Sequence, residues 1–288
     1  MSPTLSSLYI YPIKSCAGTA LRESGVGQAG LDGDRRWMLV DAAGRFMTQR
    51  QWPAMALVRP ELDGDLLRVQ ASGMPVLEIP RAPAPAAAAM QVQVWNDITD
   101  GVDQGDAAAR WFSDVLGAEC RLVGLHPQAR RHASLDYVRA WTARHGALAP
   151  GLGERHLFGF ADGFPLLVIG QSSLDDLNRR LGEGGHAPVG MERFRPNIVV
   201  AGLEPHDEDQ IALLRAGEVA MPLVKPCARC AIPNIDPATG RSAEQPGRTL
   251  IAYRGTTAGV LFGQNGLVQA PPGSVLRVGD ALEVEWAF

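Results

Sequence analysis

The residues best suited to chemistry are two cysteines three positions apart, Cys227 and Cys230, in the run Lys225-Pro226-Cys227-Ala228-Arg229-Cys230. A thiolate is both a nucleophile and a metal ligand, and neighbouring cations favour it over the neutral thiol. Lys225 and Arg229 supply two such cations. The prolines in and after the run keep it from being helical. We therefore expect reactive or metal-binding chemistry at these cysteines.

The same pair of thiols allows three other interpretations. A structural zinc site needs about four ligands, usually two such pairs, whereas Cys16 and Cys120 stand singly. A thioredoxin-like dithiol would lie at a helix N-terminus in an α/β unit, but β-rich sequence surrounds this run. Two ordinary buried thiols are the third possibility, because free cysteine is often a small core residue. All three remain open at this point.

Lysine is rare in this chain. Of its 27 basic residues only Lys14 and Lys225 are lysines, and each stands two positions before a cysteine. Lysine is a compact point charge and arginine a planar fork, so the two are not interchangeable. Chance is one explanation for the two lysines. The other is that both positions need an ammonium group.

Further cations stand where apolar strands begin or end. Phe194-Arg195-Pro196-Asn197 precedes an apolar strand, and arginine offers a bidentate fork to phosphate or carboxylate while asparagine both donates and accepts. The alternative is that Arg195 caps a loop or pairs with Glu192. Lys14 and Ser15 follow the first strand, and Arg35 precedes the next. With Lys225, these groups would suit a ligand that carries phosphate if the fold gathers them.

An acidic residue, Asp162, stands in the turn Phe160-Ala161-Asp162-Gly163-Phe164-Pro165, just before another buried strand. An Asx turn that closes the loop explains this aspartate as well as a ligand or proton role does. Both interpretations remain open.

Composition narrows the class of protein. The chain has 288 residues, 46% hydrophobic content and a net charge of −4, so it is not globally a nucleic-acid binder. It has no apolar run long enough to span a membrane, and its N-terminus does not resemble a signal peptide. Four cysteines without an export signal favour a reducing cytoplasm. The sequence has no nucleophile elbow, Walker loop or dinucleotide fingerprint.

The elements that must position these residues are mostly strands. Hairpins are expected over 36–48 and around the Asp63-Gly64 turn, and a surface loop over 82–89. One helix is expected over 107–116 with Asp103 as its N-cap, and another capped by Ser173. Residues 125–155 show little periodicity and are expected to form a surface excursion. The predicted fold is α+β and mostly β, with a small antiparallel β-barrel domain over 1–122 and a second, β-rich domain over 123–288.

Five segments, in this order along the chain, resemble the motifs of MOSC-domain proteins that carry the family's N-terminal β-barrel domain. These segments are Tyr11-Pro12-Ile13-Lys14-Ser15, Gly33-Asp34-Arg35-Arg36-Trp37, Phe194-Arg195-Pro196-Asn197, Cys227-Ala228-Arg229-Cys230 with Asp236-Pro237, and Leu261-Phe262-Gly263-Gln264-Asn265. The family includes the mitochondrial amidoxime-reducing components and bacterial relatives that detoxify hydroxylated base analogues. The resemblance implies a β-barrel MOSC domain over 123–288.

The resemblance also implies a molybdenum cofactor, in which a pyranopterin dithiolene holds the metal. The metal thiolate would come from Cys230, with Arg229 beside it, and Asp162 would be a catalytic residue or a cofactor contact. The cofactor-binding residues would be Lys14, Ser15, Arg35, Arg195, Asn197, Arg229 and Lys225. A soft thiolate suits such a metal and the cations suit a phosphate.

The implied activity is that of a molybdoenzyme which reduces N-hydroxylated compounds with electrons from a separate redox protein. Unlike some relatives, the chain has neither a ferredoxin-like cysteine cluster nor a membrane anchor. Its Ile232-Pro233-Asn234 run differs from the hydroxyl-rich version in the mitochondrial members, which bears on substrate preference. MOSC domains also resemble part of the molybdenum-cofactor sulfurases. The alternative is therefore a sulfur-carrier or cofactor-delivery protein that uses Cys230.

Overall fold

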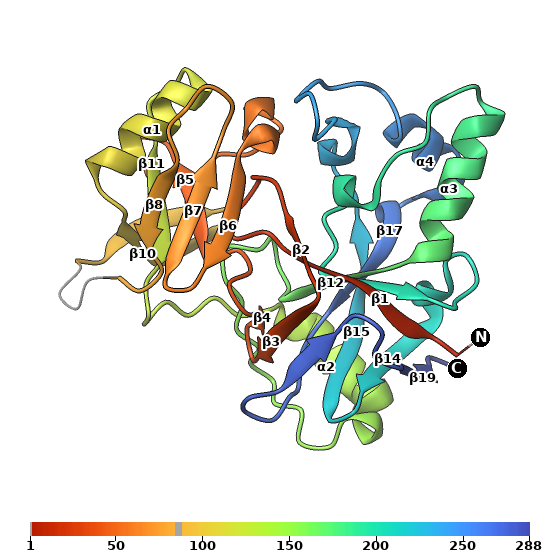
Figure 1. Ribbon diagram of the computed structural model, residues 1–288. Coiled ribbons are helices and arrows are strands. Elements are labelled where there is room, and N and C mark those ends of the chain that lie inside the picture. Colours follow the sequence, from red (N-terminus) through yellow and green to blue (C-terminus); the bar gives the residue numbers. More distant parts are fainter. Residues whose placement is uncertain (1, 84–87) are drawn as a thin grey trace.

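The computed structural model describes residues 2–83 and 88–288, and most of its regular structure is β. The largest sheet lies mainly in the C-terminal half (Figure 1). Its strands, in spatial order, are β19 (Glu283–Trp286), β14 (Ile211–Ala216), β15 (Val219–Ala228), β17 (Gly259–Gly266), β12 (Leu166–Gly170), β13 (Ile198–Ala201), β1 (Thr4–Ile10) and β2 (Thr19–Leu21), with β16 (Gly255–Thr256) on β17. Within this sheet β12 and β13 are parallel.

Three smaller sheets complete the β structure. One is four-stranded: β5 (Trp37–Val40), β11 (Arg121–Leu125), β10 (Asp97–Asp103) and β9 (Met90–Val94). Two are three-stranded: β6 (Arg59–Asp63), β7 (Leu66–Gln70), β8 (Leu77–Pro80); and β18 (Val275–Arg277), β3 (Glu23–Gly27), β4 (Gly30–Leu31). The mostly β, α+β class predicted from the sequence is confirmed, as is the hairpin at Asp63-Gly64.

Four α-helices pack on these sheets: α1 (Asp106–Leu116), α2 (Leu135–His145), α3 (Gln171–Glu183) and α4 (Gly247–Arg254). The short 3₁₀ helices are η1 (Pro53–Leu57), η2 (Gly146–Leu148), η3 (Met191–Arg193), η4 (Asp207–Gln210) and η5 (Ile232–Asn234). In the described part of the chain, no helix is both long and apolar enough to cross a bilayer.

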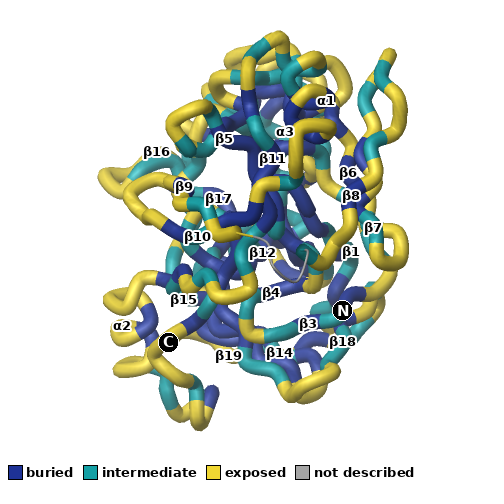
Figure 2. The backbone as a smooth tube through the Cα atoms, turned by 90° about the vertical axis from the view of Figure 1, so that its left-hand side faces the viewer, coloured by how far each residue is buried: buried dark blue, intermediate teal, exposed yellow. Residues whose placement is uncertain are grey.

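The N-terminal strands pair with the C-terminal half of the chain. β1 pairs with β13, and β3 pairs with β18. One hydrophobic cluster accordingly joins Leu5, Leu8 and Val26 to Leu166 and Leu282. Figure 2 shows the buried segments running through the interior with exposed loops around them. The boundary between residues 122 and 123 stays a prediction, and the first strands lie in sheets with strands beyond it.

Three predictions about helices were wrong. Residues 125–155 contain α2, whose buried Val138 and Trp141 make a stripe too narrow to see among charged neighbours. The N-cap of α1 is Gly105, and the Asp103 side chain accepts a bond from the Gly105 amide instead. Helix α3 begins at Gln171, two residues before Ser173. Of the predicted loop over 82–89, residues 84–87 lie outside the described residues.

Gly263 lies where β17 carries one extra residue against β15. Its φ is +82°, and an added Cβ would lie 2.8 Å from the carbonyl oxygen of Val168 on β12. We predict that Gly263→Ala lowers the free energy of unfolding by about 2 to 4 kcal/mol, because left-handed strain and a backbone clash add. Gly217→Ala, at φ +54° with nothing within 4 Å of the new Cβ, should cost only about 1 kcal/mol. If chemical denaturation gives the same loss of unfolding free energy for both variants, the backbone clash at Gly263 contributes nothing.

Candidate functional site

The sheet topology brings distant strand ends to one place. β1 runs antiparallel to β13, so the residues after β1 meet those before β13. β12 is parallel to β13, so the residues before β12 meet them too. β17 lies beside β12, and β15 beside β17, where Lys225 pairs with Asn265. All the segments singled out in the sequence therefore converge at the same end of this sheet.

A cavity of about 260 Å³ lies at that point. All nine residues predicted from the sequence line it: Lys14, Ser15, Arg35, Asp162, Arg195, Asn197, Lys225, Arg229 and Cys230. The fold thus gathers the cations that sequence spacing alone could not bring together. Their individual functional roles stay predictions.

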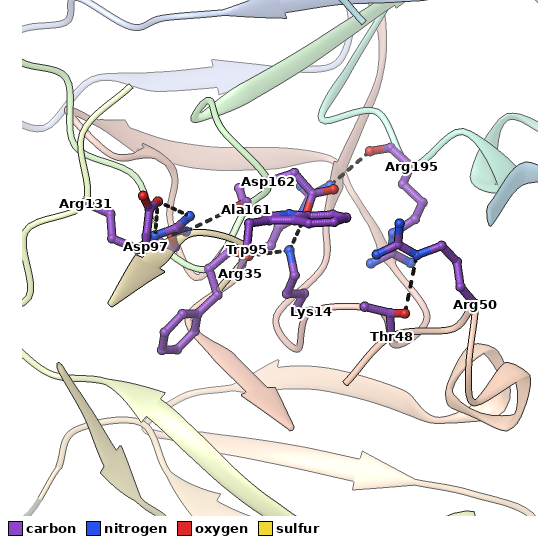
Figure 3. A network of polar contacts seen from close by, with 12 residues as sticks. Lys14, Arg35, Thr48, Arg50, Trp95, Asp97, Arg131, Ala161, Asp162 and Arg195 are labelled. Atoms are coloured by element: carbon purple, nitrogen blue, oxygen red, sulfur yellow. Dashed lines mark hydrogen bonds and ion pairs between the residues drawn. The ribbon is translucent and has the colours of Figure 1, made fainter. Parts of the chain in front are cut away.

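Lys14 and Asp162 form an ion pair on one wall of the cavity (Figure 3). The buried Lys14 ammonium also donates to the Phe160 carbonyl at 2.8 Å, and the indole Nε1 of Trp95 donates to the Asp162 carboxylate at 2.9 Å. Burial lowers the pKa of Lys14, and the Asp162 charge opposes this. The pKa of Asp162 is lowered despite desolvation, because Lys14 and Trp95 favour its carboxylate. An ionised Asp162 suits holding Lys14 better than donating a proton.

We predict that Asp162→Asn lowers the free energy of unfolding by about 1 kcal/mol near neutral pH, a modest loss because the Asp162 side chain is 66% exposed. A carboxyl whose folded pKa is depressed stabilises the protein above its unfolded pKa, and this stability is lost as pH falls through the folded pKa. The difference from the wild type should therefore be constant near neutral pH and shrink below about pH 4. Urea titrations across this range measure it.

Trp95→Phe is the matched control for Asp162→Asn. It removes the indole donor but leaves the Lys14–Asp162 pair, so it should cost less and show a smaller pH dependence. A loss on Asp162→Asn that is unchanged in acid would mean that the carboxylate charge contributes nothing.

Arg35 and Arg195 flank one buried aromatic ring, that of Tyr11, beside the cavity. Their guanidinium carbons lie 4.3 Å and 4.2 Å from the ring centroid of Tyr11. Arg35 has a counter-ion, since its NH1 lies 2.7 Å from the Asp34 carboxylate. It also donates to the Arg195 carbonyl at 3.0 Å. The backbone and ring together fix both guanidinium groups beside the cavity.

Arg195 has no carboxylate partner among the described residues. Its guanidinium donates to the carbonyl of Cys16 at 2.6 Å. Burial, together with repulsion from Arg35, lowers the pKa of Arg195 to about 10. A guanidinium enclosed without a counter-ion is costly unless a ligand supplies negative charge. Because Arg195 is positively charged and has no carboxylate partner in the described structure, its side of the cavity fits the phosphate of a cofactor.

Asn197 is buried and its amide is already used within the fold. Its Oδ1 accepts from the Leu167 amide at 3.1 Å, and its Nδ2 donates to the Tyr9 carbonyl at 3.2 Å. Asn197 thereby ties β12 and β1 to the start of β13. This geometry favours a role in positioning the neighbouring Arg195.

The two cysteines of the motif are not equivalent. Cys227 lies in β15 and is half-buried, and its sulfur accepts from NH1 of Arg229 at 3.1 Å. Cys230 follows the strand and is exposed. Arg229 is fixed further by NH2, which donates to the Phe194 carbonyl at 2.7 Å, whereas its buried Nε has no partner in the described structure. Both thiols line the cavity, and Cys230 is the more exposed of the two.

The other two cysteines are core residues. Cys16 and Cys120 are buried and free. Burial raises the pKa of the Cys16 thiol to about 12 and also raises that of Cys120. Neither thiol is suited to form a thiolate. Across residues 2–83 and 88–288, no group of three or more His, Cys, Asp or Glu side chains is placed to hold a metal. A metal at Cys230 would thus need most of its ligands from a cofactor.

Lys225 projects from β15 and is held by aromatic rings. Its ammonium lies 4.7 Å from the ring centroid of Tyr137 and 5.9 Å from that of Phe164. Tyr137 comes from α2, the helix that the sequence analysis missed. These contacts hold the ammonium at the cavity without supplying a counter-ion.

Arg50 and Trp95 also line the cavity, although no motif in the sequence marks them (Figure 3). The Arg50 guanidinium lies 4.6 Å from the ring centroid of Trp95. Trp95 also shares an unusual backbone conformation with other residues of the cavity. Five described residues other than glycine have a left-handed φ, and four of them line the cavity: Ser15, Arg35, Trp95 and Arg195. Such strain is concentrated at functional sites.

Two known domain families match most of the chain. Residues 2–119 match the family described as the MOSC N-terminal beta barrel domain, and residues 155–283 match the MOSC domain. The first match confirms the N-terminal β-barrel domain predicted from the hairpins. Residues 120–154, which include α2, lie between the two matches.

Three relatives span most of the chain. "Mitochondrial amidoxime-reducing component 1" of Mus musculus is 31% identical over 96% of the chain and 81% of that protein. "Mitochondrial amidoxime reducing component 2" of Rattus norvegicus is 34% identical over 87% of the chain and 72% of that protein. "Molybdenum cofactor sulfurase" of Oryza sativa subsp. japonica is 29% identical over 90% of the chain but only 32% of that protein.

Proposed function

The chain belongs to the MOSC-domain family that includes the mitochondrial amidoxime-reducing components, and we propose that it is a molybdenum-cofactor-dependent reductase of N-hydroxylated compounds. The observation that carries this proposal is the cavity itself. It joins the exposed Cys230 thiol to Arg195, a half-buried guanidinium with no carboxylate partner among the described residues. A soft ligand at one side and uncompensated positive charge at the other match a metal-bearing group with a phosphate.

The residues of this chain divide the work of holding the cofactor. Cys230 would supply the protein thiolate to the metal. Arg195, Arg35 and Lys225 would bind anionic groups, and Ser15 and Lys14 would bind from the loop after β1. Asp162 would hold Lys14 in place through their ion pair. Asn197 would fix the backbone beside Arg195 through its bond to Leu167. When bound, the cofactor supplies the two-electron redox chemistry.

The overall reaction cleaves an N–O bond. A compound R–NHOH takes up two electrons and two protons and gives R–NH2 and water. The electrons would come from a separate one-electron redox protein. The protons would come from water, because Cys230 is exposed and leaves this end of the cavity open to solvent. We propose a cytoplasmic setting from the sparse cysteines, all four of which are free.

The proposal is tested by purifying the chain anaerobically from a host that makes the cofactor. We expect stoichiometric molybdenum by elemental analysis, oxidised-pterin fluorescence, and turnover of benzamidoxime with an artificial reductant. Protein without molybdenum or pterin from such a host would overturn the proposal.

The sulfurase relative supports a second candidate, in which Cys230 carries sulfur or the chain delivers the cofactor. The exposed Cys230 is accessible for either role. Intact mass spectrometry distinguishes the two. One added sulfur atom on Cys230, with no turnover of any N-hydroxylated compound by cofactor-loaded protein, would favour this second candidate.

A further inference from the structure

The connecting segment, residues 120–154, lies between the two domain matches and does not line the cavity. Two of its side chains nevertheless reach the surroundings of the cavity. Arg131 precedes α2, and Tyr137 lies in the first turn of α2. The hydrogen bonds of Arg131 lead to Lys14, and Tyr137 contacts Lys225. The segment therefore contacts, directly or through one turn, both lysines of the chain.

Arg131 is a buried cation that binds backbone next to the cavity. Its side chain is only 2% exposed. NH1 donates to the carbonyls of Gly159 and Ala161 at 2.7 Å and 2.9 Å, and NH2 binds the Asp97 carboxylate at 2.8 Å (Figure 3). The ring centroid of Phe158 lies 4.4 Å from the guanidinium carbon. Because a guanidinium donates in fixed directions, Arg131 sets the conformation of the backbone from Gly159 to Ala161.

That stretch of backbone presents the acceptors of Lys14. The Phe160 carbonyl accepts from the Lys14 ammonium at 2.8 Å, and Asp162, directly after Ala161, forms the ion pair with it. They are the two acceptors that the described residues give this buried ammonium. A buried charge that loses its partners is costly. The placement of the Lys14 ammonium therefore depends on Arg131.

Tyr137 acts on the second lysine through its ring. The ring centroid of Tyr137 lies 4.7 Å from the Lys225 ammonium, closer than that of Phe164 at 5.9 Å. The two rings meet edge to face at 78°. Lysine has a long flexible stem, and an aromatic face that attracts its ammonium limits where the charge can go. Tyr137 thus holds the Lys225 ammonium beside the cavity.

We propose that Arg131 and Tyr137 are positioning residues of the cofactor site, which hold the ammonium groups of Lys14 and Lys225 where an anionic ligand binds. The inference rests on the proposed function, because the ligand it invokes is the cofactor. Neither residue lines the cavity, so each acts through its lysine. It follows that the connecting segment is part of the site as well as a link between the matched domains.

NMR of the full chain with ¹³C-labelled lysine reads both ammonium groups, because two lysines give two ε-methylene signals. Lys14→Arg and Lys225→Arg assign the signals. We expect Arg131→Gln to shift the Lys14 signal and leave the Lys225 signal in place. Tyr137→Leu should shift only the Lys225 signal, because the ring nearest the ammonium is lost.

Each variant has a matched control. Arg130→Gln makes the same change next to Arg131, but Arg130 is exposed and donates to the carbonyls of Pro127 and Ala129. It should shift neither signal. Tyr137→Phe keeps the ring, so the Lys225 signal should stay near its wild-type position. A loss of stability alone would not separate these variants by which lysine responds.

The cofactor supplies the second measurement. Pterin released on anaerobic dilution of the holoenzyme gives the apparent affinity. We expect Arg131→Gln to lower it about tenfold, comparable to the loss of an outer partner at a metal site. Tyr137→Leu should lower it roughly two- to fivefold, as for an exposed cation–π contact. Both controls should keep the wild-type affinity.

The lysine signals can be recorded with or without the cofactor, so they decide the positioning role even if the purified chain holds no molybdenum. The proposed function and this inference therefore fail separately. If Arg131→Gln does not fold, Tyr137→Leu at a position 40% exposed still decides the inference. A Lys225 signal that Tyr137→Leu leaves unmoved would overturn it. So would a Lys14 signal unmoved in folded Arg131→Gln, or a wild-type affinity in variants whose signals shift.

Discussion

Cys230→Ala is expected to abolish molybdenum retention and to lower turnover by more than about 100-fold, beyond the loss typical of a residue outside the ligand shell. Cys230 is the only exposed cysteine among the described residues. Cys16 and Cys120 are buried with raised thiol pKa values, so neither can replace it as a thiolate. Elemental analysis of the purified variant, together with a benzamidoxime assay, measures both losses.

Cys227→Ala is the matched control. Cys227 has the same chemistry three residues away, but its sulfur accepts a bond from Arg229 and it is half-buried. We expect this variant to keep most of its molybdenum and turnover. Equal losses in the two variants would show that the cysteines act as a pair, as the dithiol interpretation of the sequence requires.

The sequence predicted the candidate site better than it predicted the helices. Lys14, Arg195 and Cys230 stand in short segments at strand ends, where the residue type and its proline or glycine neighbours are visible locally. Their convergence needed the sheet order. Once β1, β12 and β13 pair as they do, these strand ends can only meet.

What the sequence could not provide depends on contacts between distant residues. Asp162 is 148 residues from Lys14, so its ion pair could not be distinguished from an Asx turn. Asn197 was expected to contact the ligand, but its amide bonds to the backbones of two strands that sequence cannot place. Trp95 has no motif around it. Its left-handed backbone conformation, which marks it in the structure, leaves no trace in the sequence.

The charges of the cavity suggest that an anionic cofactor, once bound, would also stabilise the fold. Arg35 and Lys14 have carboxylate partners, Asp34 and Asp162. Arg195 and Lys225 have none among the described residues. The fold thus neutralises only part of the positive charge that it encloses. An anionic ligand would neutralise the rest, and ligand binding to the folded state alone adds to stability.

Arg195→Met is expected to separate stability from cofactor binding. A hydrogen bond to a charged group contributes about 1.5 to 3 kcal/mol, so affinity for the cofactor should fall roughly 10- to 100-fold. The cofactor-free protein should unfold within about 1 kcal/mol of the wild type, because relief of the repulsion from Arg35 offsets the lost bond to Cys16. Position 195 has φ +58°, and arginine and methionine bear the same left-handed strain there, so the substitution does not change it.

The matched control is Arg193→Met, two residues earlier. Its guanidinium has a carboxylate within reach, Asp236 at 3.6 Å, and it does not line the cavity. Molybdenum and pterin content should therefore stay at the wild-type level. The molybdenum and pterin content and the urea unfolding curve are measured for both variants. If Arg195→Met keeps its cofactor, or loses it only together with the fold, the guanidinium is structural and the phosphate must lie elsewhere. If content falls while unfolding is unchanged, the unpaired charge is there for the ligand.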